Sequence, residues 1–230
     1  SMYNIQHTLT PVNGKLQVKL ECERPDVEIR YTMDGKEPTD RSLLYKSPLM
    51  VTGTQTIKCT TYRAGRQMGK TLTLPLVWNK ATAKPVLGNT QAGKILVNGI
   101  RGSLRQSDFE WHSWESSDSV AFTIDLQKKE SLRSVSVGCI TNYGMAAHKP
   151  ADIEVWVSND NRDYRKVSGK QFTDGEIFRE GTFKEDVVLD LNKEIGRYVR
   201  IIAKGAGECP ATHVRPGQEA RIYFDEVMIE

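Results

Sequence analysis

Hydrophobic and polar residues alternate in many short segments of the chain, which is typical of β-strands with one buried face. In the first third, the alternation covers residues 15–22, 27–33, 56–62 and 71–76. Asp34-Gly35, a strong turn signal, follows the second of these segments. No window of helical length carries an apolar stripe at a spacing of ~3.6 residues. Short strands separated by turns predict a small antiparallel sandwich here.

The same pattern continues in the rest of the chain. Strands are expected at residues 120–126, 132–139, 153–157, 187–191, 198–203 and 222–229. Between the two sets, residues 78–85 lose the alternation and are rich in small and polar residues. Pro85 restricts the residue before it to extended conformations, so the join is expected to be short and stiff. We therefore predict an all-β chain with two sandwich domains, residues 3–80 and 81–230, the second resembling a jelly roll.

Composition excludes several classes of protein. The formal net charge is +3, from 32 basic and 29 acidic residues that are interspersed, whereas a nucleic-acid groove needs a basic stripe. No apolar run approaches the ~20 residues of a membrane helix, so no membrane insertion is expected. The four cysteines contain no Cys-x-x-Cys pair, and Cys22, Cys59 and Cys139 fall on apolar stripes. Free thiols are favoured over bridges, although an even count permits disulfides.

Residues 96–126 hold the densest signals for a binding site. Asn98-Gly99 indicates a turn, because both residues tolerate positive φ. Trp111, His112 and Trp114 then lie in polar, loop-like sequence, where a core has no need of them. The alternating segment 120–126 follows as a half-buried strand. This order predicts an aromatic binding loop held by a β scaffold.

The same residues resemble a known family. Val97–Ser103, Trp111 with Trp114-Glu115, and Ile124–Leu126 resemble the discoidin or coagulation-factor type C domain. The closer resemblance is to the version that follows the catalytic barrel of bacterial β-N-acetylhexosaminidases, which is grouped with carbohydrate-binding module family thirty-two. The segments 197–201 and 222–229 resemble the last two strands of that family. The resemblance implies a discoidin-type β-sandwich for residues 81–230.

The first domain resembles a second family. Ile29–Thr39, followed by Tyr45–Pro48, is similar to the hairpin of the chitobiase/β-hexosaminidase C-terminal domain. That resemblance implies an immunoglobulin-like module beside a catalytic domain, with a structural role. Asp34 is expected to cap a turn, and a ligand contact through Tyr31 or Asp34 is the less favoured alternative.

In discoidin-like modules the sugar lies on loops at one end of the sandwich, where aromatic faces stack on it and polar groups bind its hydroxyls. The resemblance implies a carbohydrate site among Trp111, His112, Trp114, Tyr143, His148, His213 and Arg215. Alternatives remain for single residues: Trp111 and Trp114 are suited to packing in the scaffold, and His148 to a solvated loop. Residues 145–147 offer no aromatic side chain where relatives often have a bulky loop.

A structural calcium ion is also implied by the resemblance. The matching positions are Asn98, Arg101, Ser103 and Glu226. Asn98 stands where the family commonly has aspartate, so one negative charge is missing and calcium affinity is expected to fall. The alternative is a hydrogen-bonded turn without metal.

Catalysis is not expected in this chain. Asp225-Glu226 superficially resembles the acid pair of family-twenty hexosaminidases, but no barrel of alternating strands and helices exists to hold it. No Gly-x-Ser-x-Gly elbow places a nucleophile either.

The resemblance instead implies a non-catalytic accessory region of a secreted β-N-acetylhexosaminidase that binds terminal galactose or N-acetylhexosamine. The implied partners are glycans and the chain's own catalytic domain, with a monomer in a bacterial periplasm, at the outer membrane or outside the cell. Two alternatives stay open: a scaffold that packs on the catalytic barrel without a ligand, and adhesion to membranes or proteins as in animal discoidin domains.

Overall fold

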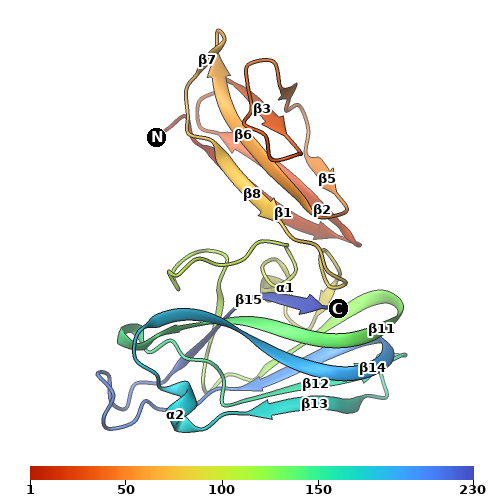
Figure 1. Cartoon of the computed structure of the whole chain (residues 1–230), viewed down its shortest axis with the longest axis vertical. Helices are drawn as coiled ribbons and strands as arrows, with labels where there is room; N and C mark the ends of the chain where they lie inside the picture. The colour runs from red at the N-terminus through yellow and green to blue at the C-terminus, as the bar shows by residue number, and fades with distance from the viewer.

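A computed structural model describes residues 1–230 and consists almost entirely of β-strands, arranged in two units stacked end to end (Figure 1). The predicted all-β fold class is confirmed. Helical structure is limited to single turns, namely α1 (Thr90–Gly93), α2 (Asp174–Ile177) and the 3-10 turn η1 (Tyr143–Met145). None of these helices has the length or the apolar character needed to cross a membrane.

Two sheets form the first unit. One contains β1 (Ile5–Val12), β2 (Lys15–Cys22) and β5 (Leu49–Val51). The other contains β3 (Glu28–Thr32), β4 (Leu43–Leu44), β6 (Gln55–Arg63), β7 (Arg66–Gln67) and β8 (Leu72–Leu76). Alternate residues point to one face of each strand, so Leu16 and Val18 of one sheet and Ile57 and Leu74 of the other share a buried core. All four strands expected in this unit are present, as β2, β3, β6 and β8, and the additions are β1, β4, β5 and β7.

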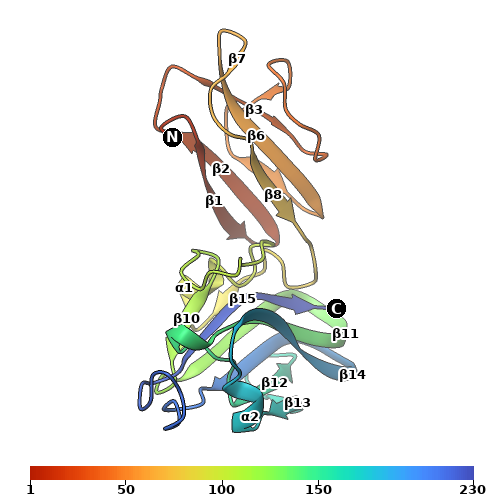
Figure 2. The same ribbon diagram turned by 60° about the vertical axis from the view of Figure 1, so that its left-hand side comes forward.

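The second unit is built on one seven-stranded sheet in the order β10-β15-β11-β14-β12-β13, with β9 paired to β11. Its strands are β9 (Val86–Leu87), β10 (His112–Glu115), β11 (Val120–Asn142), β12 (Asp152–Ser158), β13 (Arg165–Gln171), β14 (Thr182–Lys204) and β15 (Arg221–Ile229). The sheet curls around a core of 26 buried residues (Figure 2).

Two strands of 23 residues each, β11 and β14, produce this curl. Each contains two segments that the sequence indicated as separate strands. Their pairing shifts register between Asp125 and Glu130, and Gln127 has φ 70° at that point. A second shift lies between Leu132 and Ser134, and the facing residues Asn192 and Lys193 of β14 also have positive φ, at 48° and 58°. Such irregularities bend a strand and increase its twist, so one sheet supplies both layers of the sandwich.

The segment containing His112 and Trp114 is a strand, and the prediction of a loop there is wrong. It forms β10, which pairs antiparallel with β15 so that Trp114 lies opposite Ile222. The strand has only four residues, too few to reveal alternation in the sequence.

The loop of residues 96–103 holds the two units together. Val77 N donates to Gly99 O at 3.0 Å, and Ala83 N donates to Val97 O at 2.8 Å. The Ile100 side chain packs against the hydrophobic core of the first unit. The joining segment is therefore hydrogen-bonded and partly buried. All four cysteines are unpaired, as the absence of a cysteine framework indicated.

Candidate functional site

The turn at residues 98–102 is anchored by two buried acids of β15. The Glu226 carboxylate accepts the backbone N–H groups of Asn98 and Gly99, at 3.1 and 3.2 Å. The Asp225 carboxylate accepts Gly102 N at 2.8 Å and the Arg101 Nε at 2.9 Å. Burial raises the pKa of Glu226 well above its usual value. Backbone N–H groups therefore converge on both acids.

The residues predicted to bind calcium do not fit that ion in this arrangement. Calcium requires six to eight oxygen ligands directed at one point. Here N–H donors surround the Glu226 carboxylate, and the Arg101 guanidinium brings a positive charge to Asp225. The Asn98 amide oxygen accepts Ile100 N, and the Ser103 hydroxyl accepts Arg105 N. The contacts are those of the alternative, a hydrogen-bonded turn.

Trp111 and Trp114 are core residues. Their exposed fractions are 6% and 7%. Trp111 Nε1 donates to Ser103 O at 2.9 Å, and the Trp114 ring lies 6.2 Å from the Phe122 ring, nearly parallel to it. His112 is half-buried against the edge of Trp114, and burial lowers the pKa of its imidazole. Both rings pack in the interior of the sandwich, so neither has a face free for a ligand. The expectation that they stack on a sugar is therefore wrong.

The other four predicted site residues lie together at the end of the second unit that is remote from the first unit. We call this the histidine end: Tyr143 of η1, His148 before β12, Phe178 after α2, and His213 and Arg215 of the loop before β15. The Tyr143 and His213 rings are tilted by 33° with centroids 4.0 Å apart. Phe178 contacts His148 edge to face at 4.9 Å. Both views place α2 beside the loop before β15 (Figures 1 and 2).

Hydrogen bonds define the protonation of the two histidines at this end. Arg215 N donates to His213 Nδ1 at 2.9 Å, so the His213 proton lies on Nε2. His213 Nε2 faces His148 Nε2 at 3.0 Å and donates to it. His148 therefore carries its proton on Nδ1 and donates it to Ile177 O at 3.0 Å. Both imidazoles are neutral, since burial lowers the pKa of His148 to about 4 and also lowers that of His213.

Exposed groups of the histidine end surround this buried pair. His148 and His213 are only 1% and 3% exposed, so they lie beneath the surface residues and do not form the surface themselves. Arg215 is exposed, and its Nε donates to Gly144 O at 2.5 Å. Its terminal nitrogens reach Gln218 Oε1 at 3.3 Å and Met145 Sδ at 3.9 Å. The guanidinium is thus held by Gly144 and Met145 of η1, the turn that also contains the half-buried Tyr143.

Two further members of this end were missed by sequence reasoning. Phe178 follows a helix of one turn that no periodicity reveals. Cys209 is 3% exposed, and its Sγ lies within 4.8 Å of ring nitrogens of His148 and His213. The spacing Cys209-x-x-x-His213 was the available signal, since it matches a pair of ligands on one loop.

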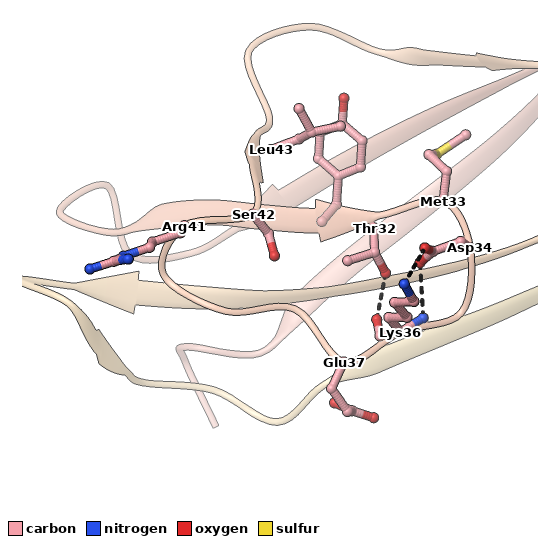
Figure 3. Close-up of a pocket in the computed structure, with 9 residues that line it drawn as sticks. Thr32, Met33, Asp34, Lys36, Glu37, Arg41, Ser42 and Leu43 are labelled. Carbon is pink, nitrogen blue, oxygen red and sulfur yellow. Dashed lines mark hydrogen bonds and ion pairs between the residues drawn. The ribbon is translucent and has the colours of Figure 1, made fainter.

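A separate cleft of about 480 Å³ lies on the first unit, between residues 31–34 and 41–43 (Figure 3). Asp34 Oδ1 accepts Lys36 N at 3.1 Å, and Thr32 Oγ1 donates to Lys36 O at 2.6 Å. Asp34 therefore caps the turn, as predicted, and these bonds occupy the polar groups on that side of the cleft.

Comparison with known proteins identifies two families. Residues 11–73 match the chitobiase/beta-hexosaminidase C-terminal domain, and residues 80–215 match the F5/8 type C domain. No curated protein sequence gave a significant match.

Solved structures with similar folds include carbohydrate-binding modules. CpGH89CBM32-6 of Clostridium perfringens is 17% identical with a TM-score of 0.38, covering 66% of this chain and 98% of that one. CpGH89CBM32-5 of the same organism, in complex with GalNAc-beta-1,3-galactose, is 16% identical with a TM-score of 0.39, covering 62% and 86%. The C-terminal domain of a chitobiase from Bacteroides fragilis is 15% identical with a TM-score of 0.33, covering 60% and 78%. The family matches, rather than these distant structures, carry the assignment.

Proposed function

Because the chain belongs to the F5/8 type C domain family and carries a chitobiase/β-hexosaminidase C-terminal domain before it, we propose that it is a non-catalytic accessory region that binds carbohydrate. We assign the immunoglobulin-like module to residues 3–80 and the carbohydrate-binding module to residues 81–230. The proposed ligands are terminal sugars of the galactose or N-acetylhexosamine type, and the proposed parent is a secreted bacterial β-N-acetylhexosaminidase.

The observation that supports sugar binding most directly is the Arg215 guanidinium, which hydrogen bonds fix against the turn η1 that carries Tyr143. A guanidinium has five N–H groups, and three contacts from Arg215 are accounted for. The remaining N–H groups are free to donate to sugar hydroxyls. The His213 ring covers one face of Tyr143, so the proposal places the apolar side of a pyranose on the other face. The buried histidine pair holds the Arg215 backbone in place through His213 Nδ1.

Such a small surface is suited to weak binding. A dissociation constant near 1 mM corresponds to about 4 kcal/mol. Tethering to an enzyme raises the effective concentration of glycan near the module, so weak binding suffices.

A glycan array probed with the intact chain tests the proposal. We expect selective signal on terminal galactose or N-acetylhexosamine. Arg215→Met and Tyr143→Ala should each weaken that signal at least about tenfold, which corresponds to 1.4 kcal/mol. Two matched controls lie away from the histidine end: Arg165→Met, whose guanidinium pairs with Glu194, and Tyr164→Ala, which lies under Arg200. Both controls should bind normally.

Selective binding that survives both test variants would place the sugar elsewhere on the chain. A blank array for the folded chain would contradict sugar binding and favour the scaffold alternative. One observation supports that alternative: Phe109 is 93% exposed beside a cleft of about 500 Å³ that residues of both units line. An exposed aromatic ring of this kind is suited to a protein contact.

A further inference from the structure

We propose that His148, Cys209 and His213 form a binding site for a thiophilic divalent cation of the zinc type. His148 lies before β12, whereas Cys209 and His213 lie on the loop before β15, yet the ligand atoms of all three lie within 4.8 Å of one another. All three residues are buried. Imidazole nitrogen and cysteine sulfur are the ligands that Zn²⁺ prefers, and carboxylate-binding cations such as calcium would not select them. This proposal does not require that the chain binds sugar, although the same histidine pair lies beneath the proposed sugar contact Arg215.

The distances are close to those of a zinc site. A tetrahedral ion with Zn–N near 2.05 Å and Zn–S near 2.3 Å holds its two nitrogens about 3.3 Å apart and each nitrogen about 3.6 Å from sulfur. The two Nε2 atoms are already 3.0 Å apart, with one proton between them. Metal binding therefore needs the histidines to separate by a few tenths of an ångström and Cys209 Sγ to approach by about 1.2 Å at most. The ion would lie between the two Nε2 atoms and Sγ and would displace the proton that the histidines share.

The surroundings of His148 are those of a metal ligand. Its Nδ1 donates to Ile177 O, which fixes the ring and leaves Nε2 directed at Cys209 and His213. Metal-binding histidines almost always use their second nitrogen in this way. Ala146, Ala220 and the partly buried Phe178 pack around Cys209. In this apolar shell the negative charge of the Cys209 thiolate would partly compensate the charge of the ion, and a water molecule would complete the tetrahedron as fourth ligand.

His213 must change its tautomer for the ion to bind. In the metal-free arrangement its Nε2 carries the proton and its Nδ1 accepts Arg215 N–H. On binding, that proton moves to Nδ1, and the Arg215 N–H turns away. The Cys209 thiol loses its proton to solvent, so one proton is released for each ion bound. The loop from Pro210 to Gly217 is exposed at most positions, which allows this small adjustment.

Cobalt substitution is the direct test. The intact, reduced chain is titrated with Co²⁺, and visible d–d bands together with a near-ultraviolet thiolate-to-cobalt band are recorded. We expect one Co²⁺ per chain, both sets of bands, and their loss when Zn²⁺ displaces Co²⁺. Cys209→Ser should lose the thiolate band and bind more than roughly 100-fold more weakly, because losing a ligand should cost more than the ~10–100-fold that losing a hydrogen-bond partner of a ligand costs. Cys139→Ser is the matched control, because Cys139 is equally buried in the same unit.

The proposal is overturned if the folded wild-type chain binds no stoichiometric Co²⁺, or binds it without a thiolate band. It is also overturned if the two serine variants behave alike, since Cys139 lies outside the cluster. Should Cys209→Ser fail to fold, His213→Asn replaces it, and retention of the full affinity in that variant contradicts the proposal.

Discussion

The ion pair between Arg101 and Asp225 offers a quantitative test of how the turn at residues 98–102 is held. The Asp225 side chain is fully buried, whereas the Arg101 side chain is 36% exposed and also reaches Asp186 at 2.5 Å. Burial opposes the charge of Arg101, but hydrogen bonds to Asp186 and Asp225 outweigh it and raise the pKa of the guanidinium. The Arg101→Met variant removes the charge and keeps most of the aliphatic stem.

Removing one member of a buried pair costs about 3–5 kcal/mol, because it leaves an isolated buried charge. We expect less here, about 2–3 kcal/mol, since Arg101 is partly in solvent and Asp225 keeps two backbone N–H donors, from Gly102 and Glu226. At about 2–4 °C for each kcal/mol, the melting temperature of the second unit should fall by about 4–12 °C.

Urea denaturation followed by tryptophan fluorescence measures the change. Asp186→Asn is the matched control: it removes only the exposed partner of Arg101, which is worth about 0–1 kcal/mol. Adding Asp225→Asn to Arg101→Met should recover part of the loss, because a buried amide does not need a cation. Equal effects of Arg101→Met and Asp186→Asn would refute the reasoning.

Three other changes have defined outcomes. Trp114→Ala should lower the free energy of unfolding by about 3–5 kcal/mol in urea titrations, because it empties the core beside Phe122; a loss below about 1 kcal/mol would contradict its place there. Gly138→Ala puts a Cβ onto the Asp225 carboxylate and near Arg101, so it should destabilise the chain, and its effect should be less than additive with Arg101→Met. The fold raises the pKa of Glu226 above the usual glutamate value of 4.5. The stability of the wild type relative to Glu226→Gln should therefore be greatest below pH 4.5 and should fall as pH rises through the pKa of Glu226 in the folded state. Urea titrations at pH 5 and pH 8 check this, and a difference independent of pH would contradict the raised pKa.

Sequence reasoning recovered the strands that have one buried face. In β12, Ile153, Val155 and Val157 are buried and the residues between them are partly exposed, so the alternation is visible. The edge strand β13 has no buried residue, and its composition resembles a loop. In β1 only Ile5 and Leu9 are buried, which is too sparse a pattern to recognise. Strands that contribute little to a core therefore leave little trace in the sequence.

The candidate site was predictable in part. His148, His213 and Arg215 were selected by resemblance and do lie together. Their proximity depends on how the sheet brings the β11–β12 connection and the loop before β15 to one end, which no local pattern encodes. Trp111 and Trp114 illustrate the opposite error, since their polar neighbours suggested a surface, and the rings turn inward.

The strand order has a consequence for the kinetics of folding. In the first unit, β1 pairs with β2 and β3 with β4, so early contacts close short loops of chain. In the second unit, β10 pairs only with β15, which is the last strand of the chain. One edge of β11 also pairs with β15 and stays unpaired until that strand is in place. Pairing between distant segments slows folding, because loop closure precedes the gain from contacts. The first unit is thus expected to fold early, while the second exposes unpaired strand edges until its final nine-residue strand arrives.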